Sequence, residues 1–214
     1  ATITFVVFIE RAQRRLLVQY PKRQVGNKMF GGDNSHLPLK LNTSGVIPAI
    51  FASSLLLMPI TIANFSSGQG PDWVNSITTL LGRGQPLYMI IYASLIVFFC
   101  YFYTAIVFNP EDTADNLKKQ GGFIPGIRPG ERTAQYIDFV LTRLTVVGSI
   151  YLVLVCLLPE FLISRFAVPF YFGGTSVLII VNVAMDTMTQ FQGYLFAHQY
   201  EGLLKKSKLG SRKR

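Results

Sequence analysis

The chain has 214 residues, of which half are hydrophobic and only 14% are charged, and its formal net charge is +9. This composition excludes an ordinary soluble domain, because domains of this length carry more charged and fewer apolar residues. The two cysteines, Cys100 and Cys156, both lie inside apolar runs. The sequence therefore predicts no disulfide framework, no metal site and no cofactor.

Four long apolar runs predict an all-α fold, a bundle of membrane-spanning helices. The predicted spans are residues 41–64, 87–108, 139–158 and 171–197. A helix needs roughly 20 apolar residues to cross about 30 Å of hydrocarbon. The alternative is that these runs are core helices of a large soluble protein. That alternative is disfavoured because four such runs in succession leave no amphipathic helices to cover them. Residues 1–9 are also apolar but cross only about half a bilayer, so we expect the end of a fifth span there and a longer polypeptide before it.

Lysine and arginine residues are distributed unevenly between the two sides of these spans. Of the 20, all but Arg83 and Arg165 fall between residues 11 and 40, 118 and 143, or 205 and 214. Positive residues collect on the cytoplasmic side of membrane proteins. The sequence therefore predicts cytoplasmic loops at 10–40 and 109–138, a cytoplasmic basic tail at 198–214, and external loops at 65–86 and 159–170.

The first cytoplasmic loop carries a set of arginines at helical spacing, on a helix that we expect to continue out of the bilayer as far as Pro21. These arginines are Arg11, Arg14 and Arg15. A compact basic turn with Lys22 and Arg23 follows. Two interpretations stay open: the charges set the topology and bind headgroups of membrane lipids, or they form a docking surface for a large polyanion such as an RNA backbone.

The helix predicted at 41–64 is interrupted by Gly45, Pro48 and Pro59 and begins with uncharged polar residues. Inside a membrane such breaks are tolerated where neighbouring helices or polar side chains satisfy the freed backbone groups. We expect one side of this helix to face protein or a hydrated crevice, which makes it the best candidate for a moving element. Polar residues that only hold static helices together remain the alternative.

The second cytoplasmic loop contains an unusual run of proline and glycine at Gly121–Arg132. A short helix at 109–120 precedes it, with acids in the first turns and lysines in the last, which suits the helix dipole. Two prolines and four glycines predict a turn-rich loop that projects into the cytoplasm. We expect this loop to present Ile127 and Arg128 at its tip, and an amphipathic stretch from Thr133 to lead back to the membrane.

Several long strings of the chain resemble the SecY family, the central subunit of the bacterial protein-conducting channel. They are Pro110–Lys119 with Phe123–Gly130, His36–Lys40 with Gly45–Ser54, and Val168–Ser176. The resemblance covers essentially the whole chain and corresponds to the carboxy-terminal half of the family. It implies one half of a two-half clamshell around an hourglass pore, in the bacterial inner membrane, with the carboxy-terminal tail in the cytoplasm.

The resemblance also implies a passive channel rather than an enzyme, driven by a partner motor ATPase or the ribosome. Such a channel passes unfolded secretory polypeptides across the membrane and releases transmembrane segments sideways into lipid. The implied partners are the SecE and SecG subunits, the SecA motor, ribosomal RNA and proteins at the tunnel exit, signal sequences, nascent chains and membrane lipids.

Site residues follow from the strings that match the family. The pore ring that seals the channel would include Ile50 and Ile179. The lateral gate would include Asn42, Thr43, Val46 and Ile47. The surface that docks the ribosome or motor would include Arg11, Arg14, Arg15, Lys22, Arg23, Arg128 and Arg132.

Asp186 supports a different class of protein, an ion- or proton-coupled secondary transporter. It is the only carboxylate inside an apolar run, and an acid within a membrane suggests transport of ions or protons. Against this alternative, we expect no second ionisable partner for it in the other spans. The residues after Met188 also become polar, which places Asp186 towards the cytoplasmic interface. His36 and His198 lie on separate segments, and no catalytic arrangement is predicted.

Overall fold

The computed structural model describes residues 1–25, 28–30, 34–65, 72–82, 84–167 and 174–211, with the backbone alone at 23–25, 28–30, 74, 174 and 201–211. Its elements in chain order are α1 (Thr2–Arg11), β1 (Gln13–Gln19), β2 (Arg23–Val25), β3 (Lys28–Phe30), β4 (Asn34–Lys40), α2 (Ile47–Phe65), α3 (Asp72–Leu80), α4 (Pro86–Val107), α5 (Pro110–Lys119), α6 (Glu131–Phe166) and α7 (Gly174–Ser211). The chain is mostly helical, as the sequence predicts.

Three helical segments of the described chain are long and apolar enough to cross a membrane. They are α2, the stretch Pro86–Lys119 that contains α4, and α6. The fourth predicted span falls on α7, which does not meet the same criteria within the described residues. The first residues of this predicted span, 171–173, lie outside the described part of the chain. The predicted number of four full spans is therefore not confirmed.

The spanning helices and α1 pack around one apolar core. Small buried residues on α2, Ala49 and Ala52, lie in this core, and such residues let helix backbones approach each other closely. The rings of Phe51 on α2 and Phe99 on α4 stack with centroids 5.8 Å apart. α7 contributes Leu178, which is fully buried. These contacts make α2, α4, α6 and α7 one bundle.

The loop predicted at 10–40 is not helical, and the helical arginine face predicted there is wrong. The helix ends at Arg11, Ala12 takes extended backbone angles, and Gln13–Gln19 forms β1. β1 pairs antiparallel with β4, and β2 pairs with β3 to form a second hairpin further out. The physical reason is the burial of alternate residues: Leu16 and Val18 face the core while Leu17 between them is exposed. This period of two outweighs the spacing of the arginines.

A second apolar core lies under this hairpin and is separate from the bundle core. We use the name cytoplasmic core for it, after the side of the membrane predicted for the loops at 10–40 and 109–138. Residues from these two loops and from α6 form it: Leu16, Val18, Leu39, Leu117, Ile124, Ile137, Val140 and Leu144. Ile137 on α6 is fully buried. The two cytoplasmic loops, about 100 residues apart in sequence, therefore fold as one unit.

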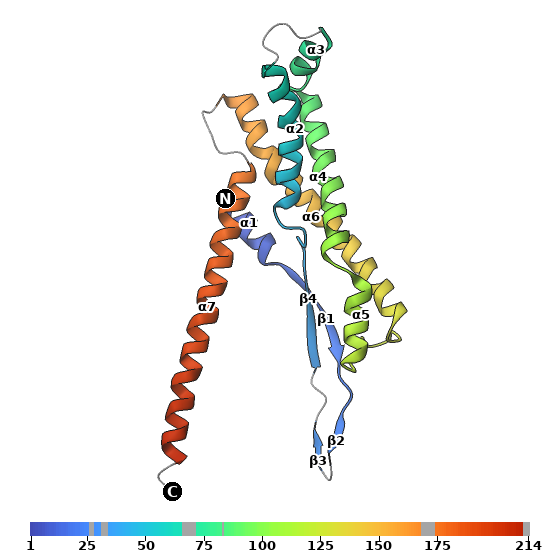
Figure 1. The fold of residues 1–214 in the computed structure, drawn as a ribbon, viewed down its shortest axis with the longest axis vertical. Coiled ribbons are helices and arrows are strands. Elements are labelled where there is room, and N and C mark those ends of the chain that lie inside the picture. The colour runs from blue at the N-terminus through green and yellow to red at the C-terminus, as the bar shows by residue number, and fades with distance from the viewer. Residues whose placement is uncertain (26–27, 31–33, 66–71, 83, 168–173, 212–214) are drawn as a thin grey trace.

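α6 connects the two cores, because it runs without interruption from the cytoplasmic loop to Phe166. The amphipathic stretch and the span predicted at 139–158 are thus parts of one helix, which continues through Pro159. Figure 1 shows the result: α3 lies at one end of the molecule, and α5, the hairpins and the carboxyl end of α7 lie at the other. The segments that carry most of the positive charge are at this second end, as the charge distribution predicts.

Candidate functional site

The β1–β4 ladder determines where the arginines of the first loop lie. Arg14 pairs with Leu39 and Arg15 pairs with Pro38, so the two arginines point to opposite faces of the hairpin. Both are exposed, and so is Arg11 at the end of α1. The three arginines therefore surround the base of the hairpin instead of forming one stripe.

The proline- and glycine-rich loop is fastened to β1 by two backbone hydrogen bonds. The Gln19 amide donates to the Phe123 carbonyl and the Phe123 amide donates to the Gln19 carbonyl, each at 2.9 Å. Gly122 allows this approach, because a β-carbon there would lie 3.0 Å from side-chain atoms of Val18 and Tyr20. Ile124, only 6% exposed, inserts into the cytoplasmic core. The loop is thus rigidly placed beside the hairpin.

Arg128 is exposed at the tip of this loop, as predicted. Its backbone carbonyl accepts a hydrogen bond of 3.0 Å from the Thr133 hydroxyl on the first turn of α6. Ile127 differs from the prediction, since it is half-buried against the cytoplasmic core instead of pointing outward. Arg132, on the first turn of α6, is also exposed. Arg128 is therefore held by its backbone while its guanidinium stays accessible.

The remaining basic residues of the predicted docking surface lie further along the hairpin. Lys22 is exposed just after β1. Arg23 begins β2, whose pairing with β3 replaces the compact turn expected there, and its side chain lies outside the described residues. We use the name cytoplasmic platform, after the side of the membrane predicted for it, for the hairpin base and the neighbouring loop. It carries Arg11, Arg14, Arg15, Lys22, Arg128 and Arg132.

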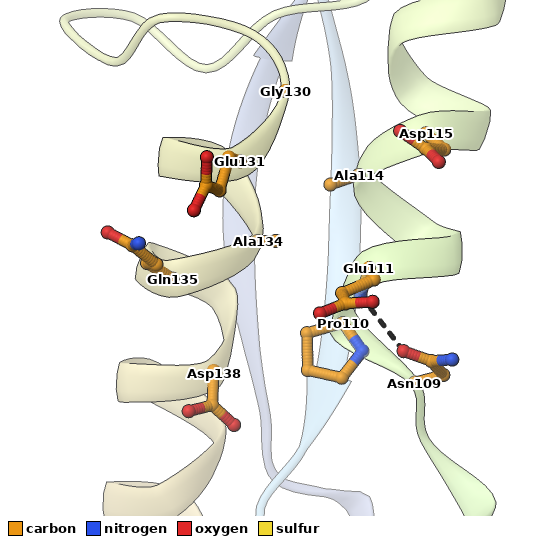
Figure 2. A pocket seen from close by; sticks show the side chains of 10 residues that line it. All are labelled: Asn109, Pro110, Glu111, Ala114, Asp115, Gly130, Glu131, Ala134, Gln135 and Asp138. Atoms are coloured by element: carbon orange, nitrogen blue, oxygen red, sulfur yellow. Dashed lines mark hydrogen bonds between the residues drawn. The ribbon is translucent and has the colours of Figure 1, made fainter.

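An acidic pocket of about 550 Å³ lies between α5 and α6, beside the cytoplasmic platform (Figure 2). Its carboxylates are Glu111 and Asp115 on α5 and Glu131 and Asp138 on α6. The Asn109 side chain caps α5 by accepting a hydrogen bond of 3.1 Å from the Glu111 amide. No group of three or more His, Cys, Asp or Glu side chains in the described chain is arranged to hold a metal ion.

Asn42, one of the four predicted gate residues, forms a buried hydrogen-bond junction at the start of α2. It is 4% exposed. Its Nδ2 donates to Glu10 Oε1 at 2.8 Å and to the Gly45 carbonyl at 3.2 Å, and its Oδ1 accepts from Ser44 Oγ at 3.2 Å. Every polar group of the amide is used to close the turn or to tie it to α1.

The other gate residues divide between interior and surface. Val46 is 7% exposed and belongs to the bundle core. Thr43 is half-buried, with its hydroxyl bonded to the Lys40 carbonyl at 3.0 Å. Ile47, at 37%, is the most exposed of the four. Of the four predicted gate residues, Ile47 is thus the best placed to contact something outside this chain.

Glu10 is an ionisable group in this junction that no pattern in the sequence singles out. Burial raises the pKa of its carboxyl, while the hydrogen bond from Asn42 and the charge of Lys40 act in the opposite direction. The structure also brings it within electrostatic range of Asp186, which is exposed on α7. Asp186 therefore does have an acidic neighbour, although not one in a predicted full span.

The two predicted pore residues lie on different helices and are both uncovered. Ile50 on α2 is 39% exposed and Ile179 on α7 is 40% exposed. Neither belongs to the bundle core, whose α2 members lie on the other side of that helix. Both side chains are therefore available to line a space outside this chain.

A family model described as SecY matches residues 1–188. Among curated relatives named protein translocase subunit SecY, that of Rickettsia bellii is 59% identical over 207 residues and that of Escherichia coli K12 is 58% identical over 210 residues. These alignments cover 97% and 98% of this chain but 48% and 47% of the relatives, so the chain spans about half the length of the curated relatives it matches.

Solved structures share the fold at low sequence identity. One, described as "The structure of a protein conducting channel", has a TM-score of 0.57 and 20% identity, over 88% of this chain and 46% of that one. Another, from work on the plug domain of the SecY protein, has a TM-score of 0.60 at 20% identity, over 88% of this chain and 47% of that one. Together with the family model, which matches most of the sequence, these findings show that the chain belongs to the SecY family.

Proposed function

We propose that this chain forms one half of the pore of the Sec translocon. In this role the channel passes unfolded secretory polypeptides across the membrane and releases transmembrane segments sideways into lipid. The observation that carries the proposal is the 58% to 59% identity to protein translocase subunits over nearly the whole chain. The channel is passive, and a partner motor ATPase or the ribosome supplies the energy.

The exposed apolar residues of α2 and α7 support this proposal. Ile50 and Ile179 contribute to an apolar ring that closes around a passing peptide and opposes ion leakage when the pore is empty. Apolar side chains suit this task because they make no sequence-specific hydrogen bonds with the substrate. Ile47, with Thr43 beside it, borders the lateral gate through which signal sequences reach lipid, and the buried Asn42 and Val46 hold the gate helix in place.

The cytoplasmic platform is the proposed docking surface for the ribosome or the SecA motor. Its arginines are exposed, while the backbone beneath them is fixed by the β1–β4 ladder and the Gln19–Phe123 hydrogen bonds. Guanidinium groups on a fixed backbone suit phosphate and carboxylate recognition, because they can bind both oxygens of such a group and little loop freedom is lost on binding. Arg128 is the residue that we propose couples the partner to the pore.

The proposed setting is the bacterial inner membrane, with the platform and the carboxy-terminal tail in the cytoplasm. SecE and SecG are the proposed companion subunits, and membrane lipids surround the assembly. The large exposed side chains Phe5 and Phe8 on α1 and Phe191 and Phe196 on α7 leave apolar surface for contacts with other transmembrane segments or lipid.

Reconstitution tests the proposal directly. The full-length polypeptide that contains this chain is placed in liposomes with its companion subunits, the motor ATPase and ATP. An unfolded secretory polypeptide should become protected from external protease, and the same polypeptide without its signal sequence should not. Uptake of a small solute driven by an ion gradient, without polypeptide translocation, would instead favour a coupled transporter and contradict the proposal.

A further inference from the structure

The segment Leu41–Gly45, which joins β4 to α2, is held by three other helices. Its Asn42 is tied to α1 through Glu10. Its Ser44 Oγ lies 3.4 Å from Cys100 Sγ on α4, and both groups are buried. On α6, Gly148 lies so close that a β-carbon there would be 2.7 Å from the Leu41 carbonyl oxygen. The segment cannot shift without disturbing at least one of these contacts.

The chain changes direction at Gly45, immediately before α2. Gly45 has a φ of +67°, a left-handed conformation that side chains disfavour. The Asn42 side chain bridges this turn by donating to the Gly45 carbonyl at 3.2 Å. The turn is therefore closed by a side chain that is itself fixed to α1.

The opposite end of α2 is held much more weakly. The buried residues of α2 are Pro48, Ala49, Ala52 and Leu56, all in the first ten residues of the helix. Beyond them Met58 is 60% exposed and Ile62 is 61% exposed. Among the described residues, the helix thus has one anchored end and one end, in contact with α3, that has no buried residue.

We propose that Leu41–Gly45 is a fixed pivot for α2, so that gate opening moves the far end of this helix while its near end stays with α1, α4 and α6. This inference rests on the proposed function, in which α2 borders the lateral gate. Asn42, Ser44 and Gly148 are positioning residues in this account. They act by holding the helix and make no contact with the translocating polypeptide.

A pivot at Gly45 predicts displacements that grow along α2. Met58 lies about 20 Å from Gly45 along the helix axis, at about 1.5 Å per residue, so a tilt of about 10° moves it by about 3.5 Å. Ile47 lies only about 3 Å from Gly45 along the axis and moves by about 0.5 Å for the same tilt. A difference of this size is measurable with pairs of spin labels.

The experiment uses the full-length channel polypeptide assembled with its companion subunits in lipid. A near pair of spin labels is placed at Ile47 and Phe102, and a far pair at Met58 and Ile90, all four of which are exposed residues of α2 and α4. The distance within each pair is measured by pulsed electron paramagnetic resonance, first in the empty channel and then in a channel that holds an arrested secretory chain. We expect the far distance to change by several Å and the near distance to stay constant.

The variants Asn42→Ala and Ser44→Ala test the anchor itself. Each should broaden the near distance distribution in the occupied channel, and Ser44→Ala keeps the test available if Asn42→Ala fails to assemble. Equal changes in both pairs, or no change in either pair while the channel carries substrate, would overturn the pivot and leave the proposed function intact. A channel that never accepts a secretory chain would overturn the proposed function itself, and the pivot with it.

Discussion

Ile124 anchors the loop that carries Arg128 to the cytoplasmic core. Replacing it by alanine measures the free energy that this anchor contributes. The side chain is 6% exposed. Ile124→Ala removes three carbon groups worth about 0.8 kcal/mol each, or about 2.4 kcal/mol of burial. The cavity left behind raises the expected loss to about 3 kcal/mol, within the usual range for such truncations.

The loss should be visible in the exchange of two backbone amides. Gln19 and Phe123 hydrogen-bond to each other across the loop and β1, so their exchange reports the local opening of this contact. Since about 1.4 kcal/mol corresponds to a factor of ten, Ile124→Ala should speed their hydrogen exchange by about 100-fold in the assembled channel. The assay is hydrogen–deuterium exchange followed by mass spectrometry.

Leu17→Ala is the matched control for this experiment. Leu17 lies on β1 next to the same contact but is 38% exposed, and it is not among the core residues. Its truncation should change the exchange of Gln19 and Phe123 by less than about tenfold, since partly exposed side chains contribute less burial. Equal acceleration by the two variants would refute the claim that Ile124 anchors the loop.

Three further predictions address the docking surface, the pore and the junction at Glu10. Arg128→Glu should block translocation while the channel still assembles. It should also weaken ribosome binding and lower the magnitude of the slope of the logarithm of the binding constant against the logarithm of salt concentration by about one, as expected for the loss of one phosphate contact and measured by co-sedimentation at several salt concentrations. Ile50→Ser should increase ion leak through the resting channel, measured as conductance in planar bilayers, because a polar ring is wetted more easily. Glu10→Gln keeps an acceptor for Asn42 and removes a carboxyl whose pKa is raised by burial. Such a group favours folding below its unfolded pKa and loses this contribution as pH rises through the raised value, so Glu10→Gln should match or exceed the parent in thermal stability at alkaline pH and lose this advantage in acid.

The helices of the bundle can be predicted from the sequence because the signals for them lie within each helix. Long apolar runs need no partner to be recognised, and Asn109, Pro110 and the acids that follow give α5 a clear start. The uneven distribution of lysine and arginine also predicts, without knowledge of the packing, which segments lie at the same end of the molecule. Arg128, the proposed docking residue, could be singled out because the prolines and glycines around it indicate a fixed loop tip.

The β-hairpin was missed because its cause is distant in sequence. Three arginines at helical spacing favour a continued helix, but Leu16 and Val18 are buried in a core to which distant residues such as Ile124 and Ile137 contribute. The alternation of Leu37 and Leu39 in β4 was the available signal, since a period of two favours a strand.

The hydrogen bonds of the junction at Asn42 could not be predicted from the sequence either. Glu10 lies 32 residues away from Asn42, and nothing in either segment shows that the two side chains meet. Gly148 looks like an ordinary small residue in a spanning helix until the Leu41 carbonyl is found beside it. Contacts of this kind depend on how the helices pack together.

The central claim is that this chain lines a pore for polypeptides, and photocrosslinking from Ile50 tests it most directly. A photoreactive amino acid is placed at Ile50 in the full-length channel, and at Phe98 as a control, because Phe98 is 61% exposed but lies on α4. With an arrested secretory chain in the channel, the probe at Ile50 should crosslink to that chain, whereas the probe at Phe98 should label lipid or companion subunits. Crosslinking that is absent at Ile50, or equal at both positions, would contradict the account.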